Sequence, residues 1–435
     1  MTRESERAAP KVARRQAILG AAGTFGGLWM STLPASAKST QANNRLNIGV
    51  VGVGDRGGDN LAAVKSENIV ALCDVDDTFL APAAKEFPAA RLYRDFRRMM
   101  EQRDIDAVVV STPDHMHAPV TMAALKSGRH VYCEKPLAHT VYEARQVTDE
   151  ARQRGLTTQL GTQIHAGDNY RRVVEVIRSG AIGVVTDVHV WADRIWTGTG
   201  RPTDRPPVPS TLVWPLWLGV APLRPYNPVY LPATWRGWWD FGGGTLADMA
   251  CHHVDLSNWA LELGPPISVE TEGPTLLAEN TPAWLIAHYQ FAATRVNPAI
   301  SLTWYNGGKR PPQFATGELP AWGDGTLFVG ETGMLLADYG RYVLLPADQF
   351  VGYVPPAPSI PASIGHHREW IEACKNHGQP RPLCNFDYGG PLSEKVLLAN
   401  VAYRSGKKLE WDSASLCARG CPEADAFIRP HYRRF

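Results

Sequence analysis

The period of hydrophobic and polar positions changes along the chain and separates two kinds of region. In the first region, short apolar runs alternate with amphipathic stretches, a pattern that predicts buried parallel strands joined by helices. These runs are Leu46–Val51, Ile69–Cys73, Ala107–Ser111 and His130–Cys133. From about residue 265 to 347, apolar and polar residues instead alternate every second position, which predicts strands with one buried face. The pattern predicts an α/β plus α+β protein, with an N-terminal doubly wound parallel sheet and a C-terminal open, mostly antiparallel sheet.

The residue pattern also predicts the individual strands of the second sheet and three helices. The predicted strands are Val184–Trp191, Ile267–Glu272, Trp284–Phe291, Ala299–Trp304, Thr326–Gly330, Met334–Asp338 and Tyr342–Leu345. The predicted helices are Tyr170–Ser179, which ends at the C-cap residue Gly180, then His366–Asn376 and Pro391–Ser405.

The N-terminal residues have the layout of an export signal. A basic stretch ends in Arg14-Arg15, an apolar, small-residue stretch follows from Ala17 to Leu33, and Ala35-Ser36-Ala37 forms an A-x-A cleavage site. The paired arginines resemble a twin-arginine signal, whose pathway carries folded proteins. We therefore expect a periplasmic or secreted protein.

Composition narrows the class of protein without naming it. The chain has 435 residues and a net charge of +1, with 44 Lys and Arg against 43 Asp and Glu. A nucleic-acid binder usually has a strong basic excess, so no such partner is expected. No segment of the mature chain has 18 uninterrupted apolar residues, so we expect no membrane span there. The seven scattered cysteines do not form a disulfide framework, although Cys417 and Cys421 are close enough in sequence to pair.

A glycine-rich turn follows the first predicted strand. Gly52, Gly54 and Gly57 form a G-x-G-x-x-G that also contains Asp55 and Arg56, and a helix is predicted after it. In that context the turn and the helix N-terminus bind a pyrophosphate. Asp74 follows the second strand, 22 residues after Gly52, where an acid binds the ribose hydroxyls. An acid there repels a 2′-phosphate, so NAD is favoured over NADP.

Polar residues also follow the next two strands. Thr112-Pro113 and His117 come after one strand, and Glu134-Lys135 come after the other. Ligands of doubly wound sheets bind beyond the carboxyl ends of strands, so these residues are expected to line the nicotinamide half of the site. From position alone, Glu134 and Lys135 can also be a surface ion pair.

A candidate acid/base group lies in the second region. Asp248 and His252 are four residues apart and share a face if they lie on a helix, and Asp255 continues the same stripe. Two acids and a histidine on one face suit proton transfer. Metal binding through His252, His253 and Asp255 is the competing interpretation, but no further set of ligands is evident and no metal is predicted.

A long Pro- and Trp-rich segment, residues 191–239, has weak periodicity and is typical of a functional loop. Its aromatic faces suit stacking on sugar rings, and Trp239 is a candidate substrate contact. Many of these side chains can instead pack the loop onto its sheet or form an oligomer interface.

The motifs taken together resemble the glucose-fructose oxidoreductase, inositol dehydrogenase and rhizopine catabolism (Gfo/Idh/MocA) family. The resemblance continues beyond the first domain in Gly161-Thr162-Gln163, Tyr170-Arg171-Arg172, Ser179–Gly183 and Gly242–Asp248 with His252 and Asp255. It implies a Rossmann domain, NAD(P) binding and hydride transfer at a secondary alcohol of a sugar or polyol. It also implies a homodimer or homotetramer formed through the C-terminal sheet.

The resemblance also suggests roles for individual residues. Lys135 is the expected catalytic lysine and Glu134 its holder, His252 is the expected general base, and Asp248 is expected to orient His252 or a substrate hydroxyl. Gln163, His165, Tyr170, Trp239 and Asp255 are the weaker candidates for substrate binding.

Two other functions remain open at this point. One is NAD-dependent glycoside hydrolysis, in which the sugar is oxidised transiently and tightly bound NAD is recycled. The other is a non-catalytic sugar-binding protein, against which the intact Lys135, Asp248 and His252 count. The predicted division of the chain is a signal (1–37), a Rossmann domain (38–160), a substrate and oligomerisation domain (161–385), and a C-terminal helix and tail (386–435).

Overall fold

A computed structural model describes residues 44–317, 319–429 and 431–435. The predicted export signal, residues 1–37, lies outside the described residues.

The first predicted sheet is a six-stranded parallel sheet in the order β3-β2-β1-β4-β5-β6. Its strands are β1 (Asn47–Val51), β2 (Asn68–Cys73), β3 (Arg91–Tyr93), β4 (Ala107–Val110), β5 (His130–Cys133) and β6 (Thr158–Leu160). The four predicted strands are confirmed. Strands β3 and β6 were not predicted, because each has only three residues and too few positions to show a period.

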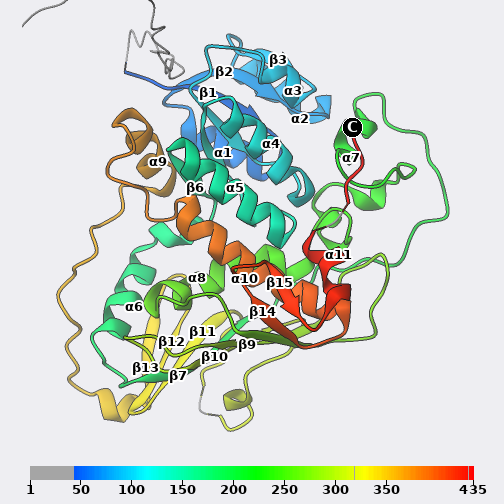
Figure 1. The fold of residues 1–435 in the computed structure, drawn as a ribbon. Helices are drawn as coiled ribbons and strands as arrows, with labels where there is room; N and C mark the ends of the chain where they lie inside the picture. Colours follow the sequence, from blue (N-terminus) through cyan, green and yellow to red (C-terminus); the bar gives the residue numbers. More distant parts are fainter. Residues whose placement is uncertain (1–43, 318, 430) are drawn as a thin grey trace, which may run out of the picture. The chain divides into compact units, whose positions relative to one another are not determined.

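Helices cover both faces of this sheet (Figure 1). They are α1 (Arg56–Val64), α2 (Asp77–Glu86), α3 (Phe96–Met99), α4 (Asp114–Lys126), α5 (Val141–Arg154) and α9 (His366–Lys375). Helices α4 and α5 contribute to the apolar cluster on one face, and α1, α2 and α9 to the cluster on the other. Helix α9 therefore packs on the parallel sheet, although its residues fall within the range predicted for the second domain.

The second sheet has nine strands in the order β13-β12-β11-β7-β10-β9-β8-β14-β15. They are β7 (Val185–Ala192), β8 (Ser268–Glu272), β9 (Leu285–Phe291), β10 (Ile300–Asn306), β11 (Gly325–Gly330), β12 (Gly333–Ala337), β13 (Tyr342–Leu345), β14 (Leu409–Asp412) and β15 (Cys417–Arg419). Every pairing is antiparallel except β7 with β10. The predicted mostly antiparallel sheet is confirmed.

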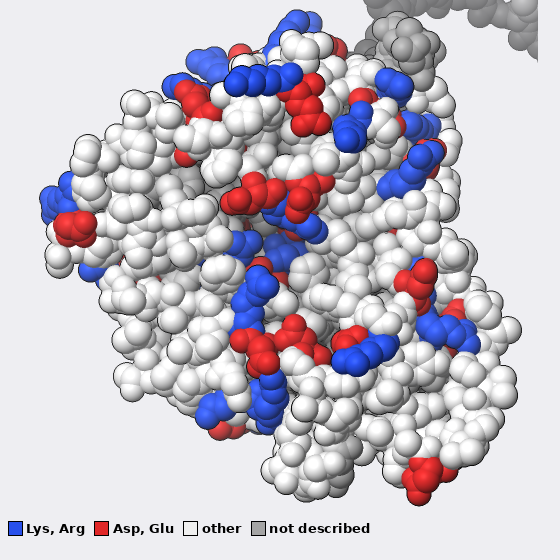
Figure 2. All heavy atoms as spheres, turned by 180° about the vertical axis from the view of Figure 1, so that it is seen from behind, with Lys and Arg blue, Asp and Glu red and all other residues white. Residues whose placement is uncertain are grey.

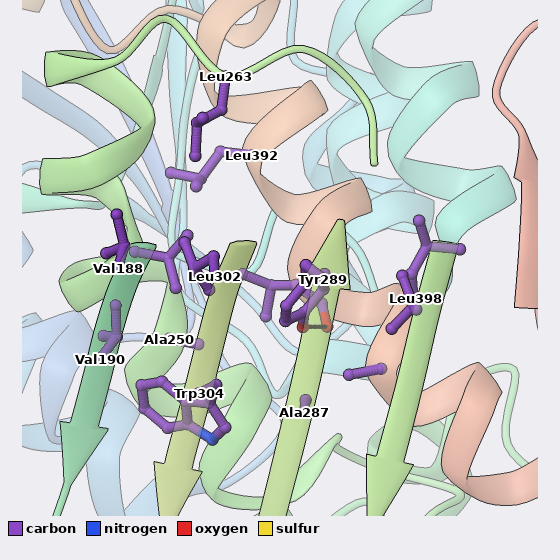
Figure 3. Close-up of a cluster of buried hydrophobic side chains, with 14 of the residues drawn as sticks. Val188, Val190, Ala250, Leu263, Ala287, Tyr289, Leu302, Trp304, Leu392 and Leu398 are labelled. Atoms are coloured by element: carbon purple, nitrogen blue, oxygen red, sulfur yellow. Dashed lines mark hydrogen bonds between the residues drawn. The ribbon is translucent and has the colours of Figure 1, made fainter. Parts of the chain in front are cut away.

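Helices fill the space between the two sheets (Figure 1). These elements are η1 (Gln163–Ala166), α6 (Asp168–Arg178), the π-helical turn η4 (Leu246–Ala250), α8 (Cys251–Ala260) and α10 (Phe386–Ser405). Figure 3 shows apolar side chains of the helices meeting those of the nine-stranded sheet, with Leu392 of α10 above Leu302 and Leu398 beside Tyr289. Burial of alternate strand residues produces the period-two pattern seen in the sequence.

Helix α10 begins five residues before the predicted start at Pro391. The Asn385 side chain accepts a hydrogen bond from the Asp387 N–H at 2.9 Å and caps the helix. Glycines 389 and 390 lie against β6 and α5, where a Cβ would come within 2.7 Å of Leu160 and 1.9 Å of Thr148. These two glycines allow α10 to pack closely against its neighbours.

The Trp-rich segment folds around an apolar cluster of its own. It contains α7 (Trp214–Leu218), η2 (Pro228–Tyr230) and η3 (Ala233–Gly237), and Trp214 stacks on Trp217 with ring centroids 4.8 Å apart. Most of its large aromatic side chains are buried in this cluster. Packing of the loop, one of the two interpretations of this segment, therefore accounts for most of its aromatic residues. The remaining short elements are η5 (Pro312–Phe314), η6 (Ala347–Phe350), η7 (Pro422–Ala424) and α11 (Asp425–Ile428).

From the sequence, Cys417 and Cys421 could form a disulfide, and no membrane span is expected in the mature chain. All seven cysteines are free thiols, including Cys417 and Cys421. In the part of the chain that the structure describes, no helix combines the length and the apolar character needed to span a bilayer.

Candidate active site

A cavity of about 1150 Å³ opens at the carboxyl ends of β1, β2, β4 and β5. Residues of η1, η3, η4 and α8 complete its lining, so both sheet regions contribute to it. Its volume exceeds the range of about 300–1,000 Å³ for a site that holds one small ligand, which suits a dinucleotide together with a second ligand. Its lining contains acidic and basic side chains, and Figure 2 shows both signs gathered around a hollow near the middle of one face.

The glycine-rich turn forms one wall of the cavity. Gly52 has a φ of +81°, and a Cβ there would lie 2.6 Å from the Ser111 carbonyl oxygen. At Gly57 a Cβ would lie 2.1 Å from the Gly52 carbonyl oxygen. Gly54, Asp55 and Arg56 line the cavity. The turn thus leaves a side-chain-free cradle at the start of α1, which fits the pyrophosphate of a dinucleotide.

Asp74 lies at the end of β2, where the adenosine ribose is expected. One carboxylate oxygen accepts the Val53 N–H at 2.9 Å and the other accepts the Asp76 N–H at 3.0 Å. Burial raises the pKa of Asp74 to about 6. Arg94, which also lines the cavity, is paired with Asp77. The ribose end thus presents a carboxylate that a 2′-phosphate would approach unfavourably.

Thr112, Pro113 and His117 lie together at the end of β4 and line the cavity. The ring nitrogens of His117 lie 2.6 Å from the Pro136 carbonyl oxygen and 2.7 Å from that of Thr112. His117 therefore joins the two loops that follow β4 and β5, and burial lowers its pKa. The buried Thr112 hydroxyl has no partner among the described residues, which leaves one polar atom for a bound ligand.

Glu134 is held by three donors on the dinucleotide side of the cavity. Its carboxylate accepts hydrogen bonds from Gln163 at 2.7 Å, Asn60 at 3.0 Å and Arg56 at 3.3 Å. The expectation that Glu134 holds Lys135 is wrong in this structure. Successive residues point different ways at the end of a strand, and Glu134 instead fixes Arg56 of the glycine-rich turn and Gln163 of η1.

Lys135 points the other way, toward the second region. Its Nζ donates to Asp248 Oδ1 at 2.7 Å and to the Asp248 backbone oxygen at 2.9 Å. Asp248 also accepts from Trp196 Nε1 at 2.6 Å and Arg236 Nε at 3.1 Å. Although burial opposes ionisation, Lys135 and Arg236 hold the pKa of Asp248 below its ordinary value. Asp248 is therefore an ionised anchor for Lys135, which corrects the expectation that it orients His252.

His252 lines the same cavity as Lys135 and Asp248. Burial, and then the Lys135 ammonium, lower its pKa well below the ordinary value. The imidazole is therefore neutral at neutral pH and has a nitrogen available to accept a proton. Asp248, in the π-helical turn η4, and His252, in α8, both line the cavity.

Asp255 does not continue that face, which is a correction to the sequence prediction. The carboxylate accepts from Tyr388 at 2.6 Å and lies 3.0 Å from His165 Nδ1, away from the cavity lining. Asp255 lies in the regular helix α8 three residues after His252, about 300° further around the axis, and its side chain is directed to His165 of η1 and Tyr388 of α10.

Three other candidates for substrate binding also lie outside the lining. His165 stacks on Trp259 at 4.0 Å, and Tyr170 donates to the His252 backbone oxygen at 3.2 Å. Trp239 donates to the Leu277 carbonyl at 3.1 Å and lines a separate, smaller cavity. These three side chains therefore contact protein groups outside the main cavity. Of the weaker candidates for substrate binding, Gln163 is the one that lines the main cavity.

Sequence reasoning missed the roles of three residues: Asp114 and Arg236 line the cavity, and Trp196 contacts Asp248. Asp114 is buried at the start of α4, and burial raises its pKa to about 7 against the opposing effects of Arg236 and Lys135. Arg236 and Trp196 come from the Trp-rich segment and bind Asp248. Asp114 directly follows Thr112-Pro113, so the argument from residues at strand ends could have identified it. Arg236 and Trp196 lie in a loop without periodicity, so their positions depend on how that loop folds.

Metal ligation by His252, His253 and Asp255 has no geometric support. His253 Nε2 lies 3.1 Å from the Tyr339 hydroxyl, while Asp255 is bound to Tyr388 and His165. Among the described residues, no three His, Cys, Asp or Glu side chains gather in a way that would hold a metal ion.

The fold and the cavity together define a two-part protein with a dinucleotide site between a parallel sheet and a second, ligand-facing sheet region. Two family models match the chain. Residues 46–162 match the oxidoreductase family with an NAD-binding Rossmann fold, and residues 169–296 match the C-terminal alpha/beta domain of the same family. Together they cover more than half of the chain, which belongs to this Gfo/Idh/MocA oxidoreductase family.

Curated relatives align over part of their length. A glycosyl hydrolase family 109 protein of Solibacter usitatus is 36% identical over 164 residues, which are 34% of this chain and 37% of the relative. Inositol 2-dehydrogenase 2 of Saccharopolyspora erythraea is 34% identical over 150 residues, 33% of this chain and 44% of the relative. The matches thus span less than half of either relative.

Solved structures share the fold over a greater length. The WlbA dehydrogenase from Bordetella pertussis, in complex with NADH and UDP-GlcNAcA, aligns with a TM-score of 0.58 and 21% identity. The alignment covers 85% of this chain and 99% of that one.

Proposed function

We propose that this protein is an NAD-dependent oxidoreductase that transfers hydride between a secondary alcohol carbon of a sugar or polyol and nicotinamide. One observation carries the proposal. A largely buried Lys135, fixed by Asp248 at 2.7 Å, lines the cavity that also contains the glycine-rich turn and His252. Bound NAD supplies the hydride acceptor, and the chain's own residues supply the binding and proton chemistry.

Lys135 acts on the reacting oxygen. Two of its three ammonium protons are directed at Asp248, so one donor remains for the substrate hydroxyl. An ammonium fixed in a buried site stabilises the alkoxide charge that develops as the hydroxyl proton leaves. Asp248 holds the ammonium in place and stays ionised while it does so.

His252 accepts the hydroxyl proton. Its neutral imidazole lines the cavity, and its low pKa keeps the ring unprotonated before turnover. General bases of this kind contribute about 10²–10⁴-fold to rate.

Absorbance at 340 nm with purified protein, NAD and a panel of polyols and sugars tests this function. Formation of NADH that requires both protein and substrate supports it. Absence of NADH with every member of the panel, together with the outcome described next, contradicts it.

A second candidate is NAD-dependent glycoside hydrolysis, which the Solibacter relative's name favours. The same Lys135 and His252 suit it, because transient oxidation of the sugar precedes elimination and the reduced cofactor is returned. Release of nitrophenol from a nitrophenyl glycoside with no net NADH identifies this activity. Net NADH without glycoside cleavage excludes it.

NAD is favoured over NADP because the ribose end presents the Asp74 carboxylate, and Arg94 beside it is paired with Asp77.

We also propose export by the twin-arginine route, on the strength of Arg14-Arg15 and Ala35-Ser36-Ala37. An exported enzyme has no supply of free NAD, so the cofactor is expected to be tightly bound. Mass spectrometry of the protein purified from the periplasm tests both the cleavage after Ala37 and the retained cofactor.

Association through the nine-stranded sheet is the proposed quaternary structure. The face of this sheet opposite the helices presents polar side chains such as His189, His288 and Gln290, so an interface there is polar in part. Light scattering coupled to gel filtration distinguishes a dimer or tetramer from a monomer.

A further inference from the structure

Two arginines share one tryptophan at the substrate end of the cavity. The guanidinium carbon of Arg236 lies 5.4 Å from the Trp196 ring centroid, and that of Arg194 lies 6.0 Å from it. Arg236 also lies 4.2 Å from the ring centroid of Trp235. Both arginines line the cavity that contains Lys135 and His252.

Neither guanidinium group has all of its N–H donors bonded to described residues. Arg236 donates through Nε to Asp248 at 3.1 Å and through Nη1 to the Ala233 carbonyl at 3.4 Å, and its Nη2 has no partner in the described chain. Arg194 has neither an ion pair nor a hydrogen bond with any described residue, and its guanidinium group lies against the Trp196 ring. Guanidinium groups stacked on aromatic rings keep their edge donors available for an anion.

The local charge also favours an anion. Lys135, Arg194 and Arg236 bring three cationic groups to this end, and Asp248 balances one of them. Asp114, another acid of the lining, is buried at the start of α4, where loss of hydration favours its neutral form. The substrate end therefore carries a positive excess that the net charge of the whole chain, +1, does not reveal.

We propose that Arg194 and Arg236, which both lie against Trp196, form a subsite for an anionic group on the sugar substrate, next to the Lys135–Asp248 pair. This inference rests on the proposed function for the identity of the sugar, but its binding step does not require hydride transfer. Guanidinium groups bind carboxylate and phosphate through paired hydrogen bonds, so a sugar acid or a sugar phosphate is the class of substrate.

Equilibrium binding to NAD-saturated protein tests the subsite. Isothermal titration compares glucuronate with glucose, galacturonate with galactose, and glucose 6-phosphate with glucose. At least one acid is expected to bind 10-fold or more tightly than its neutral parent, and to weaken with added salt. The carboxylate and phosphate probes then distinguish the two sources of the charge.

The variant R194Q isolates the contribution of the arginine. It is expected to weaken binding of the preferred acid at least 5-fold and to leave the neutral parent within 2-fold. The matched control is R341Q, because Arg341 also stacks on a tryptophan, Trp322, at 4.0 Å but lies outside the cavity. Equal binding of acids and neutral parents, or an R194Q effect that is the same for both, overturns the subsite. A measured acid preference without NADH formation instead leaves the subsite standing and contradicts the oxidoreductase function.

Discussion

Glu134 and Asp248 are two buried carboxylates that differ in what they hold. Both have side chains less than one tenth exposed, and each accepts several hydrogen bonds. The donors to Glu134 come from the glycine-rich turn, α1 and η1, whereas those to Asp248 come from Lys135 and the Trp-rich segment. One carboxylate organises the dinucleotide side of the cavity and the other organises the reacting side. Their variants should therefore affect different steps.

Removal of the lysine held by Asp248 should have the largest effect. Lys135→Met keeps the length of the side chain but removes the donor to the reacting oxygen. We expect kcat to fall at least 100-fold with NAD affinity unchanged, because the lost interaction forms with the developing alkoxide. Steady-state kinetics and NAD titration measure the two quantities.

Lys375→Met is the matched control. Lys375 pairs with buried Glu67 at 2.7 Å, the same separation as Lys135 and Asp248, but outside the cavity. Its kcat should stay near that of the parent protein. Comparable losses in both variants would show that the Lys135 effect is structural.

Asp248→Asn should have the second largest effect. It removes the negative partner from a buried ion pair and leaves Lys135 and Arg236 without a counter-charge. We expect the free energy of unfolding to fall by about 3 kcal/mol and kcat to fall roughly 10-fold. Glu67→Gln breaks the comparable pair with Lys375 and should lose stability but keep kcat. Urea unfolding and initial rates separate the two effects, and an unchanged kcat in D248N contradicts the anchoring role.

Glu134→Gln should change cofactor binding rather than turnover. The amide cannot match the carboxylate as a partner for Arg56, so the glycine-rich turn loses a fixed cation near the pyrophosphate. We expect the Kd for NAD to rise about 5-fold, while kcat at saturating NAD changes less than 2-fold. Glu394→Gln, which breaks a pair with Arg145 outside the cavity, should leave the Kd unchanged. A fall in kcat larger than the rise in Kd would place Glu134 on the reacting side.

The sequence predicted only part of the division of the cavity into a dinucleotide side and a reacting side. The glycine-rich turn, Asp74 and Lys135 follow strands, and a strand end fixes where the next residues lie. Asp248 and His252 both line the cavity, whereas Asp255 does not, because its carboxylate is bonded to Tyr388 and lies beside His165. Trp196 and Arg236 belong to a segment without periodicity, so their contact with Asp248 depends on tertiary packing that no local pattern encodes. The partners of Glu134 are 29 to 78 residues away in sequence, so local sequence patterns do not identify them either.

Asp114→Asn should change the pH dependence of stability. Burial raises the pKa of Asp114 to about 7, above the value near 3.9 of an unfolded chain. Between these values the folded protein binds more protons at this residue than the unfolded chain, so its contribution to stability falls as pH rises from about 4 to 7. Removing the titrating group should make the stability curve of the variant flatter by up to about 1.4 kcal/mol per pH unit in that window. Urea unfolding at pH 5, 6 and 7 measures the slope, and Asp204→Asn, a substitution in the Trp-rich segment outside the cavity, serves as the control. Parallel curves for D114N and the parent protein would mean that Asp114 is ionised in the folded state, and that Lys135 and Arg236 then outweigh its burial.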